Sequence, residues 1–232
     1  MKLKHLFESE YGNGIKLLGN EITELPDDLP EKITGIFFCT NTNIKSLANC
    51  PREVIGRFNI SRNDRLKTLE YGPISVGEFI CDDGELKSLS FAPRKVGKSF
   101  SCEFNKLTSL EGFPVEVGGD ILLSGNKLTS LDHLPMIIHG DLNVSENKIR
   151  TLQDVHKKIK KVGSLDLMYN PIKSHILGLM LIEVEEILYG TQEDDDDTVS
   201  DILNKWKNQG RKGALGCQRD LIAAGYKELA QL

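Results

Sequence analysis

The residues that could do chemistry in this chain are its cysteines, its histidines and one run of acids. Cys217 precedes an acid in the segment Cys217-Gln218-Arg219-Asp220. A thiolate nucleophile close to other polar groups is the arrangement that thiol-dependent enzymes use. Cys217 also lies one helical turn from Leu221, and this apolar neighbour favours a packing role over catalysis.

Metal and cofactor sites need ligands at a regular spacing, and the remaining candidates lack it. The chain has five cysteines, an odd number, and no Cys-x-x-Cys pair, which argues against a disulfide framework or a structural zinc site. The five histidines are scattered, and no glycine motif for binding phosphates or dinucleotides occurs. The acidic run at 193–197 suits a solvated linker better than a calcium site. The sequence therefore predicts no metal, no cofactor and no enzymatic activity.

Composition and charge exclude several classes of protein. Apolar residues make up 39% of the 232 residues, enough for a packed core, and the formal net charge is −5. The longest apolar stretch, Ile176 to Ile182, is far shorter than the roughly 20 residues of a membrane span. The chain turns acidic at Glu8, too early for a secretory signal. We therefore expect a cytoplasmic protein without a membrane span, and the acidic balance disfavours nucleic acid as a partner.

An internal repeat of about 21 residues organises most of the chain. The sequence Asn-Lys-Leu-Thr-Ser-Leu begins at Asn105 and again at Asn126, and we call the position of this asparagine the anchor. Anchors follow one another at spacings of 21, 22, 21, 21, 21, 21 and 23 residues, and seven of the eight are asparagine. The anchors are Asn20, Asn41, Asn63, Gly84, Asn105, Asn126, Asn147 and Asn170.

Apolar residues occupy fixed positions around each anchor. Two apolar columns precede the anchor by five and three positions, which is the period-2 spacing of a short strand. One such strand cannot bury its own apolar face, so neighbouring strands must stack in parallel. The anchor amide can bond the backbone of adjacent turns, and a weak point is expected at Gly84, which has no amide side chain. Cys81 and Cys102 stand in an apolar column and are interpreted as buried packing residues.

This pattern resembles the leucine-rich repeat family, whose consensus is LxxLxLxxNxL. The resemblance covers about residues 14–175, or eight units. It implies an α/β solenoid, a leucine-rich repeat horseshoe with a concave parallel sheet. Because the 21-residue unit is short, we expect extended or single-turn helical return legs between the strands.

Both ends of a solenoid need a cover. Residues 1–13 contain four large apolar side chains and are predicted to be an N-terminal cap. The repeat stops near His175, and residues 176–232 are predicted to be an all-helical C-terminal segment that packs on the repeats. Its first helix would run from Ser174 to about Leu188, where apolar residues recur at helical spacing. Further helices are predicted at 199–208, 214–224 and 226–232, with a break at 210–213.

The concave face is the predicted binding surface. In the assumed register, the positions six, four, two and one before each of the eight anchors face the concave side, 32 in all. They hold eight acids and three bases, so their net charge of −5 equals that of the whole chain. Apolar residues ringed by charge are typical of a protein-binding patch, although a merely solvated sheet is the alternative. The predicted partner-binding residues are Phe37, Ile80, Asp82, Asp83, Glu103, Phe104, Leu122, Asp141, Glu146, Asp166, Met168 and Tyr169.

The sequence therefore predicts a non-enzymatic protein-binding module whose partner has a basic or mixed-charge surface. The repeat units around Leu107 and the tail from Gly213 to Leu232 are similar to those of small repeat proteins of tailed bacteriophages. That resemblance implies an accessory phage protein that binds or inhibits a host factor in the bacterial cytoplasm. Two alternatives stay open. One is a structural or self-assembling, virion-associated protein. The other is a repeat effector with ubiquitin-ligase-like chemistry at Cys217, although that family's motif is Cys-x-Asp and Asp220 lies one place too late.

Overall fold

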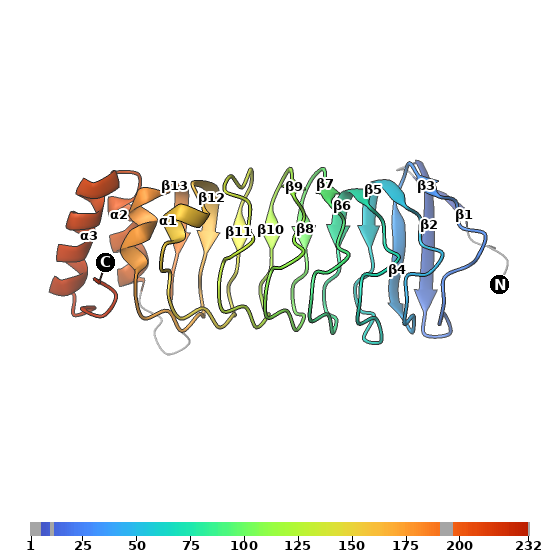
Figure 1. The fold of residues 1–232 in the computed structure, drawn as a ribbon, viewed down its shortest axis with the longest axis horizontal. Helices are drawn as coiled ribbons and strands as arrows, with labels where there is room; N and C mark the ends of the chain where they lie inside the picture. Colours follow the sequence, from blue (N-terminus) through green and yellow to red (C-terminus); the bar gives the residue numbers. More distant parts are fainter. Residues whose placement is uncertain (1–5, 10–11, 191–196, 232) are drawn as a thin grey trace. The chain divides into compact units, whose positions relative to one another are not determined.

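The computed structural model describes residues 6–9, 12–190 and 197–231, and Figure 1 shows its elements. The chain is a parallel-sheet β-solenoid of about eight turns, so the predicted solenoid is confirmed. It divides into two compact units, unit 1 (Met1–Asp120) and unit 2 (Ile121–Leu232). In the part of the chain that is described, the helices all belong to unit 2.

Unit 1 is built on strands that pair turn by turn. β1 (Leu6–Ser9) runs antiparallel to β2 (Gly12–Gly19). The parallel strands that follow β2 are β4 (Phe37–Thr42), β5 (Glu53–Asn59), β6 (Ser75–Ile80) and β8 (Phe100–Ser101). A second short ladder comprises β3 (Lys32–Ile33), β7 (Lys95–Val96) and β9 (Glu116–Val117), with β3 pairing to β5 and β7 to β6 and β9. The predicted cap at 1–13 is thus an antiparallel strand where it is described, and residues 1–5 and 10–11 lie outside the described residues.

A row of stacked phenylalanines forms the centre of unit 1. The ring centroids of Phe37 and Phe58 are 5.2 Å apart, and those of Phe58 and Phe79 are 5.9 Å apart. Phe100 continues the row at 5.0 Å from Phe79, and Phe113 packs its edge on Phe100 at 5.0 Å. Such ring pairs contribute about 0.5–1.5 kcal/mol each beyond the area that they bury. One ring per turn therefore helps to fix the register between neighbouring turns.

The register of the second turn differs from the sequence prediction by one residue. Phe37, predicted to bind a partner on the concave side, is 0% exposed and belongs to the phenylalanine row. Phe38 takes the outward position, and Thr42 takes the anchor position assigned to the preceding asparagine. The Thr42 hydroxyl and backbone N–H donate to Asn63 Oδ1 at 2.5 and 3.1 Å. The prediction for Phe37 is therefore wrong, because ring stacking and the hydrogen bonds of Thr42 both favour the shifted register.

Buried asparagines join successive turns at the anchor positions. Asn147 Nδ2 donates to the carbonyl oxygens of Leu123, Val144 and Ser145. Asn147 Oδ1 accepts the N–H of Leu128, so one side chain serves four backbone groups on two turns. Equivalent bonds to the preceding turn are made by Asn63, Asn105 and Asn170. The first predicted anchor, Asn20, has an exposed side chain instead.

Unit 2 uses the same construction. Its parallel strands are β10 (Ile121–Leu122), β11 (Leu142–Asn143), β12 (Lys161–Asp166) and β13 (Glu183–Leu188). The return leg after β11 contains one short helix, α1 (Val155–Lys158), and the leg after β12 contains a 3-10 helix, η1 (Ile176–Leu181). These short return legs agree with the expectation from a 21-residue unit.

β13 lies where the sequence analysis predicts a helix. Val184 and Ile187 are buried and pair with Val162 and Leu165 of β12. Apolar residues three apart suggest a helix, but β12 has the same spacing and is also a strand. The prediction of an all-helical segment at 176–232 is therefore wrong at 183–188. Pairing with β12 satisfies the backbone there and buries both apolar side chains at once.

Two helices follow β13. α2 (Thr198–Trp206) is close to its prediction, whereas α3 (Gly210–Ala223) begins within the predicted break. Gly213 and Gly216 allow close packing, because a Cβ on Gly213 would overlap the carbonyl oxygen of Trp206 and a Cβ on Gly216 would lie 2.6 Å from its ring. Residues 226–231, predicted to be helical, form turns.

Side chains on and just after α2 cover the outer edge of β13. Ser200, Asn204 and Asn208, spaced four residues apart, bond the backbone of Tyr189, Ile187 and Val184, respectively. Each side chain accepts from the strand N–H and donates to the strand carbonyl, at 2.7–3.0 Å. An open strand edge invites pairing with another chain, and these bonds occupy that edge with side chains instead.

Candidate functional site

One side of the unit 1 strands points away from the phenylalanine row, and we call it the strand face. It holds most of the predicted partner-binding residues of unit 1. Phe38, Asn59, Ile80 and Ser101 lie in register on neighbouring strands. Because side chains alternate along a strand, these residues face outward from the buried rings. Phe38 and Ile80 are half-buried, so the face presents apolar surface on a rigid support.

Acids at the ends of the strands lie on the same face and are held in place by hydrogen bonds. Asp82 Oδ1 accepts from the Ser101 hydroxyl at 2.6 Å and from the Glu103 N–H at 2.9 Å. Burial raises the pKa of Asp82 above its ordinary value, although these two hydrogen bonds act in the opposite direction. Asp83 is exposed and pairs with Arg62, with 3.3 Å between Oδ2 and Nε. The face therefore carries fixed acids, some of which are already neutralised within the chain.

Phe104 combines exposure with an unfavourable backbone conformation. Its side chain is 48% exposed, and its φ of 51° lies in the left-handed region that bulky residues avoid. The same position in earlier turns holds Asn41, Arg62 and Asp83, with φ of 55°, 58° and 53°. The turn itself thus imposes the conformation, and polar residues there can be solvated. Phe104 instead exposes an aromatic ring close to acids, which is the usual composition of a binding anchor.

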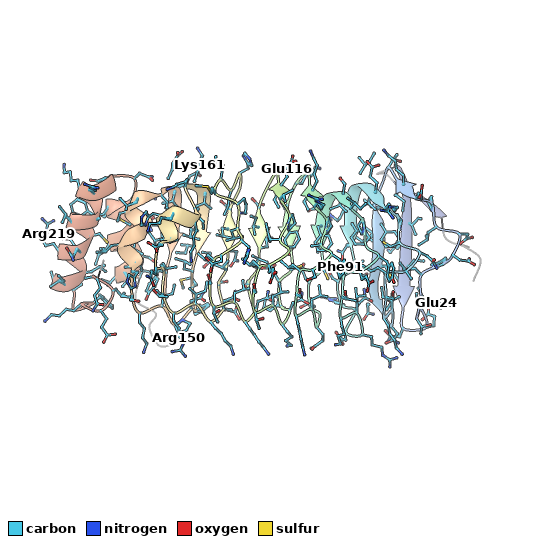
Figure 2. The ribbon with its side chains drawn as sticks, in the orientation of Figure 1. Glu24, Phe91, Glu116, Arg150, Lys161 and Arg219 are labelled. Atoms are coloured by element: carbon cyan, nitrogen blue, oxygen red, sulfur yellow. The ribbon has the colours of Figure 1, made fainter. Side chains whose placement is uncertain are left out.

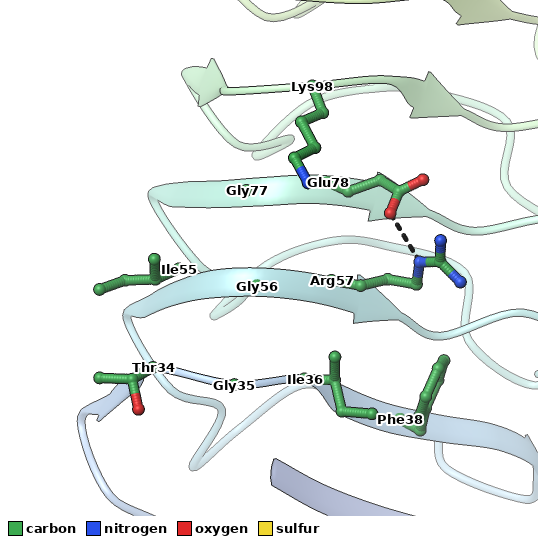
Figure 3. A pocket seen from close by; sticks show the side chains of 10 residues that line it. All are labelled: Thr34, Gly35, Ile36, Phe38, Ile55, Gly56, Arg57, Gly77, Glu78 and Lys98. Atoms are coloured by element: carbon green, nitrogen blue, oxygen red, sulfur yellow. Dashed lines mark hydrogen bonds and ion pairs between the residues drawn. The ribbon is translucent and has the colours of Figure 1, made fainter. Parts of the chain in front are cut away.

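A hollow of about 340 Å³ opens on the strand face at the beginning of β4, β5 and β6 (Figure 3). Ile36 and Phe38 form part of its wall. The Arg57–Glu78 ion pair lines it as well, with 2.6 Å between Nε and Oε2. Lys98 comes from the next turn. The hollow can therefore accept a mixed apolar and polar side chain from a partner.

Sequence reasoning missed this hollow because the register of the second turn placed Phe38 in the core. A signal was available in three glycines, Gly35, Gly56 and Gly77, which are 21 residues apart. A Cβ on Gly56 would overlap the carbonyl oxygen of Gly35, and a Cβ on Gly77 would overlap that of Ile55. The strands approach too closely here for any larger residue, and the absence of side chains leaves the hollow open.

Unit 2 carries the other predicted partner-binding residues. Leu122, Asp166 and Met168 are half-buried, whereas Asp141, Glu146 and Tyr169 are exposed. Asp141 Oδ1 accepts the N–H of Ser164 at 2.7 Å, and Asp166 Oδ1 accepts the N–H of Met168 at 2.9 Å. Burial raises the pKa of Asp166. The single patch predicted from the sequence is thus two sets of residues, one on each unit.

The candidate nucleophile is not activated. Cys217 is 0% exposed, and burial raises its pKa to about 12, the opposite of the low pKa that thiolate chemistry requires. The other four cysteines are buried as well, and all five are free thiols. Within the ranges that are described, no three His, Cys, Asp or Glu side chains gather as a metal site. Of the acidic run at 193–197, only Asp197 belongs to the described residues.

Within 6–9, 12–190 and 197–231, no helix is both long enough and apolar enough to cross a membrane. No family model matches this chain, and the searches of curated proteins and of solved structures found no match. A functional assignment therefore depends on the geometry of the two units.

Proposed function

We propose that this chain is a non-enzymatic, leucine-rich-repeat-like module that binds a partner protein on the strand face of unit 1. The observation that carries the proposal is Phe104, an exposed ring held in a left-handed turn beside acids. Ile80 and the hollow around Phe38 supply further apolar surface. A rigid sheet reduces the entropy lost on binding, because its side chains are already positioned.

The charges of this face favour a partner with a basic or mixed-charge surface. The backbone N–H of Glu103 donates to Asp82 Oδ1, and the Arg62–Asp83 pair lies one position further along each turn. Complementary charge at such a rim raises the association rate and orients the partner. The resemblance inferred from the sequence alone, between these repeats and those of tailed-phage proteins, implies a host protein as the partner. Five free thiols support a cytoplasmic location, since disulfides are rare there.

The test is affinity capture from a bacterial lysate, read by mass spectrometry, with three versions of the protein. Phe104→Asn removes the ring but keeps a residue that tolerates the left-handed conformation. Leu215→Asn is the matched control, because Leu215 is an exposed apolar residue on α3. We expect at least one protein to be retained by wild type and by the control and lost with Phe104→Asn. If no captured protein depends on Phe104, the strand face is not the binding surface.

A further inference from the structure

A second surface of unit 1 is formed by the return legs, where four consecutive turns line a groove of about 690 Å³. We call it the return-leg groove and define it by Arg52, Tyr71, Ile74, Phe91 and Arg94. Phe91 is labelled in Figure 2. None of the residues predicted from the sequence to bind a partner lies on this surface.

The two aromatic residues of the groove stand at positions that suit other residue types. Tyr71 and Phe91 have φ of 67° and 68°, and each is the third residue of a four-residue turn. The turns are closed by hydrogen bonds of 2.9 Å, from Gly72 N–H to Leu69 O and from Ala92 N–H to Leu89 O. A positive φ at this place in a turn favours Gly or Asn.

Neighbouring turns obey that preference. The equivalent positions hold Asn49 and Gly112, with φ of 69° and 87°. Tyr71 and Phe91 break it, and they are also 63% and 62% exposed, so the chain itself covers little of either ring. The positive φ of Tyr71 and Phe91 lowers the stability of the fold, and their side chains add little to the core. Both residues therefore point to a function other than folding.

A ladder of backbone hydrogen bonds sets the spacing of the other groove residues. Ile74 N–H donates to Arg52 O at 2.8 Å, and Arg94 N–H donates to Ile74 O at 2.9 Å. Ile74 is 47% exposed and stands between the two arginines. Strands repeat at about 4.8 Å, so the arginines are roughly 10 Å apart at the backbone.

The arginines differ from their charged neighbours, because no acid of the described part of the chain is paired with them. On the adjacent ladder, Lys32 pairs with Glu53 and Lys95 pairs with Glu116, each at 3.0 Å. Among the residues that the structure describes, no carboxylate lies within 4.0 Å of the guanidinium groups of Arg52 and Arg94. Both side chains are exposed and can therefore pair with a ligand.

We propose that the return-leg groove binds an extended segment of a partner protein in which two acidic residues flank large apolar side chains. Arginine is well suited to pair with a carboxylate, and exposed aromatic rings pack on aliphatic or aromatic side chains. In an extended peptide alternate residues face the same side, so two acids four residues apart face one surface together with the apolar residue midway between them. They lie about 13 Å apart, within reach of two long arginine side chains whose backbones are roughly 10 Å apart. Asp27 and Glu31 line the first-turn end of the groove, and their charge disfavours a polyanion such as nucleic acid. This surface is distinct from the strand face, and the inference does not rest on the function proposed for that face.

The test is selection of a random dodecapeptide library on the full-length protein. We expect enriched sequences with Asp or Glu on both sides of Leu, Ile, Phe or Trp. Their affinity should fall at least tenfold in Arg52→Ala/Arg94→Ala and stay within twofold in Arg65→Ala, an exposed arginine outside the groove lining. Enrichment of basic peptides, of peptides insensitive to the double variant, or of no peptide at all would overturn the proposal.

A second variant separates binding from folding. Tyr71→Asn/Phe91→Asn places a residue suited to the left-handed turn at both positions, so the melting temperature should stay equal or rise while peptide binding is lost. A lower melting temperature would show that the rings hold the fold, and the proposal would fail. The strand-face variant Phe104→Asn should leave peptide binding unchanged, which distinguishes failure of this groove from failure of the strand face.

Discussion

Removing the side chains that cover the edge of β13 should destabilise the chain and make it associate. Asn204 makes two hydrogen bonds to the backbone of Ile187, at 3.0 and 2.7 Å, and Asn208 makes two to Val184 at the same distances. Each bond is worth about 1 kcal/mol net, so Asn204→Ala/Asn208→Ala should lose about 3–4 kcal/mol. The better helix propensity of alanine at Asn204 returns roughly 0.5 kcal/mol.

The free energy of unfolding is measured by urea denaturation, and association by sedimentation velocity over a range of concentrations. Asp201→Ala is the control on the same helix, because Asp201 is exposed and gains the same helix propensity. It should stay within about 1 kcal/mol of wild type, since it loses only a first-turn acid. If the double variant is as stable as Asp201→Ala, the bonds do not hold the edge. If it is less stable but associates no more than wild type, the edge does not invite pairing.

Three further predictions concern the anchors, the half-buried Asp82 and the thiols. Asn147→Ala should lower the free energy of unfolding by about 2–4 kcal/mol, because buried backbone groups lose their hydrogen-bond partners. Asn20→Ala should change it by less than about 0.5 kcal/mol, because Asn20 is exposed. Equal effects in urea denaturation would contradict the role of the buried asparagines in joining the turns. The raised pKa of Asp82 means that the folded state binds its proton more tightly than the unfolded state, so this acid makes stability fall as pH rises above its unfolded pKa of about 3.9. Asp82→Asn should therefore gain stability relative to wild type as pH rises from 3 to 7 in denaturant titrations. A constant difference between the two proteins would refute this. All five buried cysteines, including Cys217 with its pKa raised to about 12, should react with a thiol reagent only as fast as the chain opens, and one rapidly labelled thiol in the native protein would be evidence against it.

The solenoid could be predicted from the repeat, because the apolar positions that recur in each unit are buried at almost every turn. The failure at the second turn has a local cause: Phe37 and Phe38 are adjacent, and Asn41, Thr42 and Asn43 can each supply an anchor. A shift of one residue then exchanges core and surface for the whole strand. The stacking of Phe37 on Phe58 and the hydrogen bonds of Thr42 to Asn63 decide between the two registers, and neither contact can be read from one repeat alone.

The end of the solenoid was mispredicted for a different reason. Val184 and Ile187 fit both a helix and a continuation of the repeat, as Val162 and Leu165 show. The choice depends on whether the previous strand offers an open edge, which is a property of the neighbouring turn. Prediction of the candidate site met the same limit. The spacing of the repeat was enough to place Phe104 on the surface. The hollow and the return-leg groove could not be predicted, because they depend on how the glycines and turns of neighbouring repeats pack.

The left-handed positions connect the stability of unit 1 with its two proposed surfaces. Asn41 and Gly112 adopt this conformation with little loss of stability. Tyr71, Phe91 and Phe104 each lower the free energy of unfolding by about 1 kcal/mol through their left-handed backbone. A solenoid tolerates this, because its stability is a sum over many turns and their interfaces. Replacing the three rings together by asparagine should therefore raise the free energy of unfolding by about 1–3 kcal/mol, as measured by urea denaturation. A decrease in the free energy of unfolding would mean that the rings stabilise the fold. The backbone conformation of these aromatic residues would then no longer support binding at either surface.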